Sequence, residues 1–334
     1  MAPRVHTRHT KEDLISPHLK TMTRTPKKLP SVAILMCTYH GEAFLEEQLD
    51  SIETQDYKNW TLFVNDDGSK DATLNILKTY QKKWGVKKLH IRRGPQKGFC
   101  QNFLQIINDP KINADLYFLS DQDDVWMPHK LRHTLKKIAK LDATKPYLYC
   151  ARTTYVSSDA KKILGQSDLF LKPPSFKNAL IQSLAGGNTM AFNNPLKKVL
   201  QNYPRVDVVS HDWWLYMLNE LVGGQTHYDT ESTILYRQHA RSLIGANTGF
   251  LAKMKRLRMM LSGTYRTYNT KHLQAFNRLN LKGIQKNIQL VDQFFILRDK
   301  PMKVRWQMIH KLGLYRQTWD GHLALYFGAI LHKL

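Results

Sequence analysis

The chain has 334 residues, 42% of them hydrophobic and 23% charged, which is enough for one large folded domain with an extension. Its 50 Lys and Arg residues against 27 Asp and Glu give a net charge of +23, which favours anionic partners: phosphorylated small molecules, acidic lipid head groups or nucleic acid. Three widely separated cysteines argue against a disulfide framework or paired zinc ligands, and no apolar run reaches the roughly 20 residues of a membrane span, so we expect a cytoplasmic chain with at most peripheral membrane contact.

Residues 1–30 are basic and polar with little periodicity, which predicts a flexible arm without the apolar core of a secretory signal. From Ser31 to Asp124 short apolar runs alternate with amphipathic segments. The expected strands are 31–39, 60–69, 87–94 and 114–124, and the expected helices are 42–55, 71–84 and 99–109. This alternation predicts βαβ units, and therefore an α/β fold with a mostly parallel sheet flanked by helices.

Polar residues close three of the predicted strands. They are Thr38-Tyr39, Asp66-Asp67-Gly68-Ser69 and Asp121-Gln122-Asp123-Asp124. Ligands of such sheets bind beyond the carboxyl ends of the strands, so we expect these residues to share one rim. No G-x-G-x-x-G follows the first strand and no P-loop motif occurs in the sequence, which removes most support for nicotinamide dehydrogenases and P-loop enzymes.

The acidic run Asp121–Asp124 predicts a metal site. Three carboxylates within four positions repel one another unless a cation or solvent relieves the repulsion. With Mg²⁺ or Mn²⁺ between them, they can bind a diphosphate and stabilise the charge of a leaving group. The alternative is an acid-rich turn that caps a helix starting near Pro128. The second acidic pair, Asp66-Asp67, favours the metal, although such a pair alone is often only a turn.

Residues 208–221 predict a helix whose start is marked by Ser210, His211 and Asp212. An Asp at this position is usually an N-cap. Asp212 could instead be a general base that removes a proton from an acceptor hydroxyl.

Two further groups have competing interpretations. Trp213 and Trp214 either pack in the core or form an apolar wall for the sugar ring of an acceptor. His239, with Arg237 and Arg241 nearby, is either an ordinary histidine or a contact for a metal or a diphosphate.

The C-terminal part of the chain is basic and helical in pattern. Residues 250–261 place apolar side chains on one helical face and Lys and Arg on the other. This arrangement is typical of an element that lies on a membrane surface, and helices packed on the domain or an oligomer interface are the alternatives. We therefore expect an arm (1–30), a catalytic domain (31–247) and a basic α-helical extension for membrane association or oligomerisation (248–334).

Taken together, the early motifs resemble the family 2 glycosyltransferases of the GT-A fold, from about Ser31 to Asn247. The segments that carry this resemblance are 31–55, 62–73 and 117–131. Later segments look like the branch of bacterial rhamnosyltransferases that build cell-surface polysaccharides, namely 186–193, 210–218 and 234–247. The Q-x-x-R-W motif and transmembrane helices of the processive synthases in this family are missing from the sequence, which favours transfer of single sugar residues.

The resemblance implies roles for residues on the donor side. Thr38, Tyr39 and Asp67 match the positions that hold the nucleotide base and ribose. Asp121 and Asp123 form the D-x-D motif, in which Asp123 is the expected direct metal ligand.

On the reacting side, Asp212 matches the catalytic base, and His211 replaces the acid that usually precedes it. His239 matches a contact to the metal or the diphosphate. Lys97 and Arg237 are expected to face the diphosphate.

The reaction implied is a displacement with inversion at the anomeric carbon, with Mn²⁺ or Mg²⁺ as cofactor. The expected donor is dTDP-L-rhamnose, with UDP-sugars next, and the expected acceptor is a lipid-linked saccharide at the inner face of the cell membrane, where an anionic surface suits the basic extension. A nucleotidyltransferase or a nucleic-acid-binding protein are rival interpretations, but no nucleic-acid motif occurs in the sequence. The sequence leaves open the sugar, the acceptor and the linkage. It also leaves open the oligomeric state, for which a homo-oligomer is one alternative.

Overall fold

The structure is a computed structural model that describes residues 29–204, 206–239, 254, 258–278 and 284–334. Most of the predicted arm and most of the predicted amphipathic helix at 250–261 lie outside these residues, as does the predicted domain boundary after Asn247.

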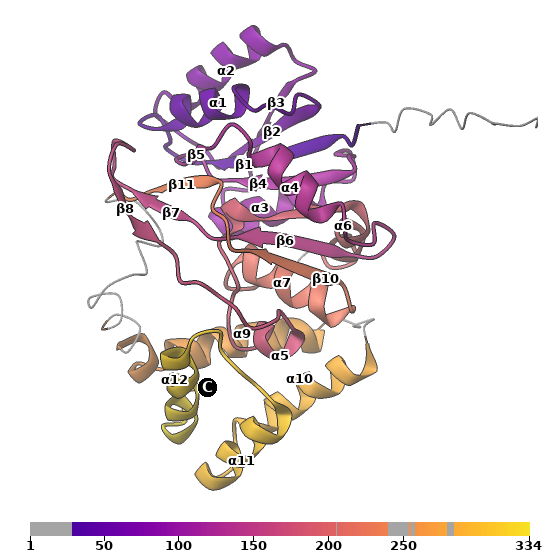
Figure 1. The fold of residues 1–334 in the computed structure, drawn as a ribbon, viewed down its shortest axis with the longest axis vertical. Coiled ribbons are helices and arrows are strands. Elements are labelled where there is room, and N and C mark those ends of the chain that lie inside the picture. Colours follow the sequence, from indigo (N-terminus) through magenta and orange to yellow (C-terminus); the bar gives the residue numbers. More distant parts are fainter. Residues whose placement is uncertain (1–28, 205, 240–253, 255–257, 279–283) are drawn as a thin grey trace, which may run out of the picture.

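A seven-stranded sheet in the order β10-β6-β9-β4-β1-β2-β3 forms the centre of the molecule (Figure 1). Its strands are β1 (Val32–Thr38), β2 (Trp60–Asp66), β3 (Leu89–Arg93), β4 (Leu116–Ser120), β6 (Tyr147–Ala151), β9 (Ala191–Asn193) and β10 (Gln225–Asp229). All neighbours pair in parallel except β9, which is antiparallel to both β4 and β6. The predicted α/β fold with a mostly parallel sheet is therefore confirmed.

Helices cover both faces of this sheet. They are α1 (Leu45–Glu53), α2 (Thr73–Trp84), α3 (Phe99–Asn108), α4 (Lys130–Ile138), α5 (Phe176–Ala179), α6 (Asn194–Gln201) and α7 (His211–Leu221), and a single 3-10 turn, η1, spans Gly187–Thr189. All seven residues of β1 are buried, and alternate ones point to opposite faces. Ala33 and Leu35 pack in the core with α3, α6 and α7, whereas Val32 and Ile34 pack in the core with α1 and α4. Burial on both faces explains why the strand is apolar without alternation.

A smaller sheet in the order β5-β11-β7-β8 lies beside the first. Its strands are β5 (Val125–Trp126), β7 (Thr154–Val156), β8 (Ile163–Gln166) and β11 (Ile234–Arg237). The segment 226–239, strand-like in the sequence, is split here between β10 of the large sheet and β11 of the small one. Asp229 ends β10, and its carboxylate accepts hydrogen bonds from His133 (2.7 Å), Tyr149 (3.0 Å) and the backbone of Glu231 (3.1 Å). These bonds hold the turn that separates the two strands.

The C-terminal helices pack below α7 (Figure 1). They are α9 (Thr264–Arg278), α10 (Gln285–Leu297), α11 (Met302–Leu312) and α12 (Trp319–Ile330). Phe276 of α9 lies against Trp214 of α7 with ring centroids 5.1 Å apart, so the extension shares a hydrophobic core with the lower face of the sheet. Among the helices that the structure describes, none has the length and hydropathy needed to cross a bilayer.

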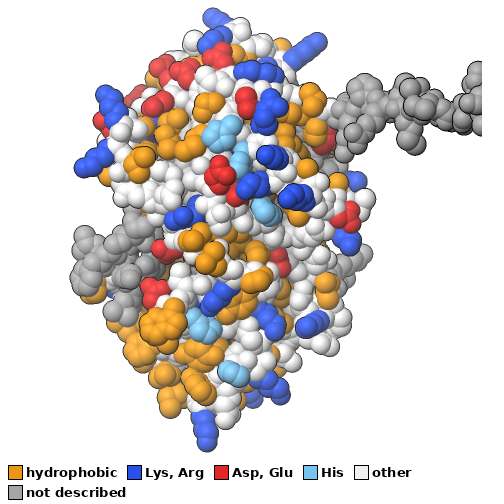
Figure 2. Space-filling view, in the orientation of Figure 1, with side chains coloured by type: hydrophobic (Ala, Val, Ile, Leu, Met, Phe, Trp, Pro, Cys, Tyr) orange, Lys and Arg blue, Asp and Glu red, His pale blue; other side chains and the backbone are white. Residues whose placement is uncertain are grey.

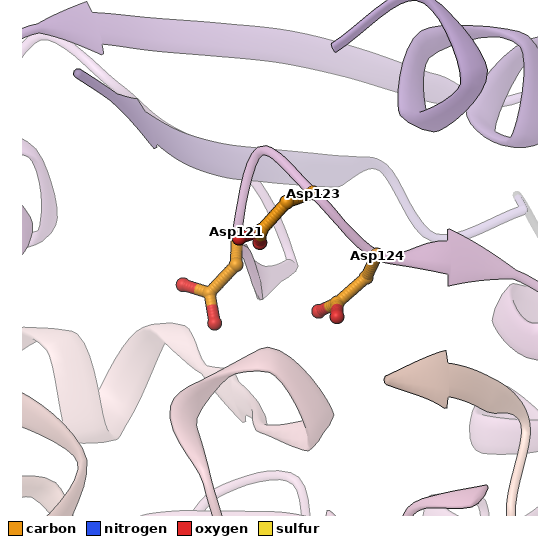
Figure 3. A group of neighbouring side chains, drawn as sticks. All are labelled: Asp121, Asp123 and Asp124. Atoms are coloured by element: carbon orange, nitrogen blue, oxygen red, sulfur yellow. The ribbon is translucent and has the colours of Figure 1, made fainter. Parts of the chain in front are cut away.

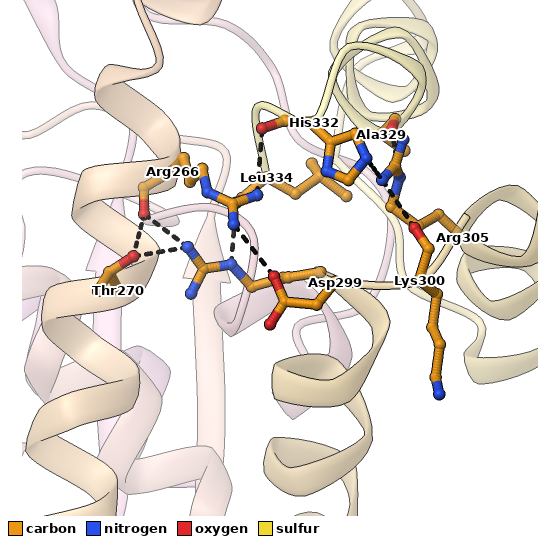
Figure 4. A network of polar contacts seen from close by, with 9 residues as sticks. Arg266, Thr270, Asp299, Lys300, Arg305, Ala329, His332 and Leu334 are labelled. Carbon is orange, nitrogen blue, oxygen red and sulfur yellow. Dashed lines mark hydrogen bonds and ion pairs between the residues drawn. The ribbon is translucent and has the colours of Figure 1, made fainter. Parts of the chain in front are cut away.

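Buried arginines hold the last residues of the described C-terminal region in place (Figure 4). Arg305 donates to the backbone oxygens of Ala329 (2.6 Å), Lys300 (2.8 Å) and Ile330 (3.2 Å). Arg298 donates to the backbone oxygen of Leu334 at 2.9 Å. The bonds to Ala329, Ile330 and Leu334 satisfy carbonyl groups at the C-terminal end of α12, and the bond to Lys300 ties this end to the start of α11.

We expect Arg305→Ala to lower the free energy of unfolding by about 3 kcal/mol, because it removes three hydrogen bonds to backbone oxygens and leaves a cavity where a large buried side chain was. Urea unfolding followed by circular dichroism measures this change. Lys303→Ala, an exposed side chain on the same helix, is the matched control and should stay within about 0.5 kcal/mol of the parent. Equal stability of the two variants would contradict the anchoring role of Arg305.

Candidate functional site

The carboxyl ends of β1, β2 and β4 meet at one rim of the large sheet. Thr38 pairs in register with Asp66, and Met36 pairs with Ser120, so the polar residues that follow each strand start side by side. The Thr38 hydroxyl donates to Asp66 at 2.9 Å. The structure thus brings the three polar strand ends together, as the sequence predicted.

Three carboxylates gather on the loop between β4 and β5 (Figure 3). One oxygen atom from each of Asp121, Asp123 and Asp124 lies within 4.8 Å of the others. Burial, together with the nearby charges of Asp123 and Asp212, raises the pKa of Asp121 to about 8. Burial and the charges of Asp121 and Asp123 also raise the pKa of Asp124 well above its ordinary value. The loop therefore resists carrying three negative charges at once.

The donor set of this loop fits a divalent cation. Asp124 is fully buried, and its Oδ2 accepts a hydrogen bond from the side chain of Asn188 at 2.8 Å. Its Oδ1 is buried without a hydrogen-bond partner in the part of the chain that the structure describes. A buried carboxylate oxygen with no donor is costly, and a cation would satisfy it. Carboxylate oxygens are also the ligands that Mg²⁺ and Mn²⁺ prefer.

His239 and Asp123 come together although 116 residues separate them in the sequence. The Nε2 atom of His239 lies 2.8 Å from Oδ2 of Asp123, and Phe44 packs beside the imidazole with ring centroids 4.6 Å apart. A carboxylate and an imidazole at this distance can share a metal ion, and the metal roles of this pair stay predictions.

Arg237 lies behind the acidic loop and does not face it. Its side chain is 1% exposed, donates to the backbone oxygens of Asp123 (3.0 Å) and Ser158 (2.5 Å), and forms an ion pair with Glu47. The prediction that Arg237 contacts a bound diphosphate is therefore wrong for this structure. A guanidinium buried to this extent must direct its donors at protein acceptors, and here it positions the backbone of Asp123.

Gln122, for which the sequence predicted no role, joins two of the strand ends. Its Oε1 accepts a hydrogen bond from the backbone nitrogen of Tyr39 (2.8 Å), and its Nε2 donates to the backbone oxygen of Tyr39 (3.0 Å). A Cβ atom on Gly41 would lie 2.4 Å from Oε1 of Gln122, so the close approach requires glycine there. The ring of Tyr39 stays exposed beside this clamp. Only its place between two aspartates could have marked Gln122 in the sequence.

Asp67 connects the end of β2 to the loop before α3. It is 8% exposed and accepts hydrogen bonds from the backbone nitrogens of Gln96 (2.6 Å) and Gly98 (2.9 Å). Lys97 lies between these two residues and is exposed. Its side chain lines a surface hollow of about 840 Å³ next to α3, which contains no residue of the acidic loop. The donor-binding roles of Asp67 and Lys97 stay predictions.

Asp212 is the second residue of α7 and lies near enough to the acidic loop for its charge to contribute to the raised pKa of Asp121. Its carboxylate accepts a hydrogen bond from the backbone nitrogen of Trp213 at 2.7 Å, and the start of α7 favours a negative charge there. The neighbouring His211 is buried and stacks on Phe103 with ring centroids 4.0 Å apart. Burial lowers the pKa of His211 to about 4, so the imidazole is neutral at physiological pH.

The two tryptophans that follow are core residues. Trp214 has no exposed surface, and Trp213 is 7% exposed, with its ring nitrogen donating to the backbone oxygen of Ala179 at 2.7 Å. The predicted apolar wall for an acceptor sugar is therefore wrong for this structure. The reason is that α7 lies between the sheet and the C-terminal helices, and almost every side chain of the helix is buried.

We expect the metal-free protein to lose stability as the pH rises from about 5 to about 9. The pKa of Asp121 in the folded state, about 8, lies above its unfolded value of about 4. Stability that is fully present at low pH is therefore lost as the pH rises through the folded pKa. Thermal unfolding in EDTA measures the slope, and Asp121→Asn should make it shallower.

Added Mn²⁺ should raise the unfolding temperature most near pH 9, because the carboxylates are then ionised without competition from protons. If the unfolding temperature fell equally steeply with pH in the parent and in Asp121→Asn, the predicted role of Asp121 in the pH dependence would be wrong.

Comparisons with known proteins agree on what kind of protein this is. The sequence profile of Glycosyl transferase family 2 matches residues 33–275. The dTDP-rhamnosyl transferase RfbG of Shigella flexneri is 30% identical over 282 residues, which cover 79% of this chain and 94% of that protein. The uncharacterized glycosyltransferase RP339 of Rickettsia prowazekii is 25% identical over 290 residues, covering 80% of this chain and 86% of that protein.

Two solved structures share the fold. TarS of S. aureus in complex with UDP-GlcNAc has a TM-score of 0.54 at 14% identity, over 91% of this chain and 89% of that one. The mannosyltransferase PcManGT of Pyrobaculum calidifontis, in complex with GDP-Man and Mn²⁺, has a TM-score of 0.52 at 13% identity, over 91% and 86%. These likenesses confirm the predicted GT-A fold. With the family profile covering the sheet, its acidic rim and α7, the chain belongs to the family 2 glycosyltransferases.

Proposed function

We propose that this glycosyltransferase moves L-rhamnose from dTDP-L-rhamnose onto a hydroxyl group of a lipid-linked saccharide, with inversion at the anomeric carbon and with Mn²⁺ or Mg²⁺ bound. The observation that carries the mechanism is the acidic loop, with its orphaned Asp124 oxygen, near enough to Asp212 at the start of α7 for the carboxylates to interact electrostatically. The similarity to the dTDP-rhamnosyl transferase RfbG along most of both chains supports the choice of donor.

Different rim residues hold different parts of the donor. Asp123, Asp124 and His239 would hold the metal ion, which supplies positive charge to the departing diphosphate. Thr38, Tyr39 and Asp67 come from the neighbouring strand ends, and we assign the base and ribose to them. Because the clamp of Gln122 fixes Tyr39 to the acidic loop, the nucleoside and diphosphate ends of the site are held at a fixed separation.

Asp212 acts on the acceptor. Its carboxylate takes the proton of the acceptor hydroxyl, whose oxygen then bonds to the anomeric carbon while the bond from that carbon to the diphosphate breaks. The proton stays on Asp212 and the electron pair of the broken bond leaves with dTDP. The neutral imidazole of His211 adds no second negative charge next to Asp212, unlike the acid that commonly occupies this position.

The proposed acceptor also determines where the reaction takes place and what the C-terminal extension does. A lipid-linked saccharide is a membrane molecule, so we place the reaction at the inner face of the cell membrane. We assign residues 31–247 to catalysis and 248–334 to attachment or oligomerisation.

Calorimetric titration tests the donor. We expect dTDP-L-rhamnose to bind in the presence of Mn²⁺, to lose most of its affinity in EDTA, and to fail to bind Asp123→Ala. UDP-glucose and UDP-galactose are the comparison ligands. Selective binding of a UDP-sugar would overturn the rhamnose assignment and keep the metal site, whereas no binding of any nucleotide sugar would overturn the proposal.

Asp212→Asn is the matched variant for the chemical step. It should bind the donor like the parent but transfer about 10²–10⁴-fold more slowly, because a general base contributes a factor of that size. Release of dTDP in the presence of a lipid-linked saccharide measures transfer. An Asp212→Asn enzyme with parental turnover would remove the base assignment.

We also expect Gln122→Ala to weaken donor binding about tenfold, because it removes two hydrogen bonds that each contribute roughly 0.5–1.5 kcal/mol to the position of Tyr39. Titration with the same donor and Mn²⁺ measures the loss. Gln166→Ala, on the exposed strand β8, is the control. Unchanged affinity in Gln122→Ala would show that the clamp does not shape the donor site.

A further inference from the structure

Helix α12 carries an exposed apolar stripe. Trp319, Leu323, Phe327 and Ile330 are 76%, 51%, 46% and 41% exposed, respectively. They occur at spacings of four, four and three residues, so they lie along one face of the helix. Asp320 is the only charged residue in the helix. Large apolar side chains exposed in one contiguous stripe indicate a surface that binds another protein, a membrane or a ligand.

Helix α11 widens this surface. Trp306 is 50% exposed and lies beside Tyr326 of α12, with ring centroids 5.7 Å apart. Met302, one turn before Trp306, is 55% exposed. Figure 2 shows hydrophobic side chains gathered at the lower left of the molecule, where Figure 1 places α12. Tryptophan and tyrosine are the residues enriched where a protein meets the interface of a bilayer.

The stripe is exposed on a helix that is firmly held from behind. Arg305 and Arg298 bind the carbonyl groups at its C-terminal end, and Leu325 and Ala329 on its inner side are buried in the core (Figure 4). The outward direction of the four apolar residues is therefore fixed by the fold. Twelve residues are too few to span a bilayer, so such a helix can only lie along its surface.

Basic groups flank the stripe. Lys172 donates to the backbone oxygen of Arg316, just before α12, and Lys333 follows the helix at its other end. The segment 284–334 has eight Lys and Arg residues, of which Arg298 and Arg305 are buried, so six remain against three Asp. A second copy of this chain would bring the same positive charge to the contact, whereas an anionic lipid surface complements it.

We propose that the outer face of α12, with Trp306 of α11, is the surface on which the protein docks to an anionic phospholipid bilayer. The helix lies in the plane of the interface, its apolar stripe enters the head-group region, and the flanking Lys and Arg residues contact lipid phosphates. This docking surface builds on the lipid-linked acceptor proposed above, because it would bring the enzyme to the membrane that holds that acceptor.

Vesicle flotation of the full chain tests the surface without any substrate. We expect the protein to float with vesicles of phosphatidylethanolamine and phosphatidylglycerol, and not with vesicles of phosphatidylcholine alone. A Trp319→Gln and Leu323→Gln double variant should bind the anionic vesicles at least tenfold less. Val86→Gln removes an apolar side chain that is 67% exposed outside the C-terminal helices, and it should bind like the parent.

Two further readouts keep the outcome clear. The double variant should retain Mn²⁺-dependent donor binding, which shows that it is folded and separates this proposal from the proposed function. Brominated phosphatidylglycerol should quench tryptophan fluorescence in the parent and less so in Trp319→Phe. Equal flotation of the parent and the double variant would overturn the proposal. So would a dimer, seen by light scattering, that the double variant abolishes while vesicles bind neither protein.

Discussion

The repulsion among Asp121, Asp123 and Asp124 is the constraint on which the rest of the site depends. The fold surrounds this loop with partners that fix it while leaving carboxylate oxygens free for a cation. Gln122 ties it to the end of β1, Arg237 holds the backbone of Asp123 from behind, and Asn188 occupies one oxygen of Asp124. A loop held in this way would bind the proposed divalent ion without rearrangement, because folding has already brought the charges together.

Patterns local to the sequence predicted the sheet and the rim well. Seven consecutive buried residues mark β1, and acidic turns that directly follow buried strands mark the rim. Side chains whose role depends on burial were not predictable in the same way. Arg237 and Trp214 look like ligand contacts in a one-dimensional motif, yet each is covered by elements far away in the chain, Glu47 of α1 and Phe276 of α9. Gln122 had no signal beyond its place between two aspartates, because its partner is the backbone of Tyr39.

Charge has different meanings in different parts of this protein. The chain is strongly positive overall, but the side chains that gather at the rim are negative. This local negative charge fits the proposed site, in which a cation binds before an anionic donor. In the C-terminal helices, buried arginines serve as structural caps for carbonyl groups, while Lys172 and Lys333 flank an apolar stripe at its two ends. Net charge therefore indicated the class of partner, but only burial separates the arginines that stabilise the fold from the side chains available to a surface.

The route of the chain through β10 and β11 has a consequence for how the protein folds. Glu47 and Arg237 are 190 residues apart, and Asp123 and His239 are 116 apart, so these contacts join early and late parts of the chain. Contacts between such distant residues form late, since the loop between them must be closed first. During synthesis, an N-terminal fragment can bury β1 to β4 while it still lacks the histidine that completes the site. The metal ion proposed for this site would therefore stabilise the finished fold over its partly folded precursors.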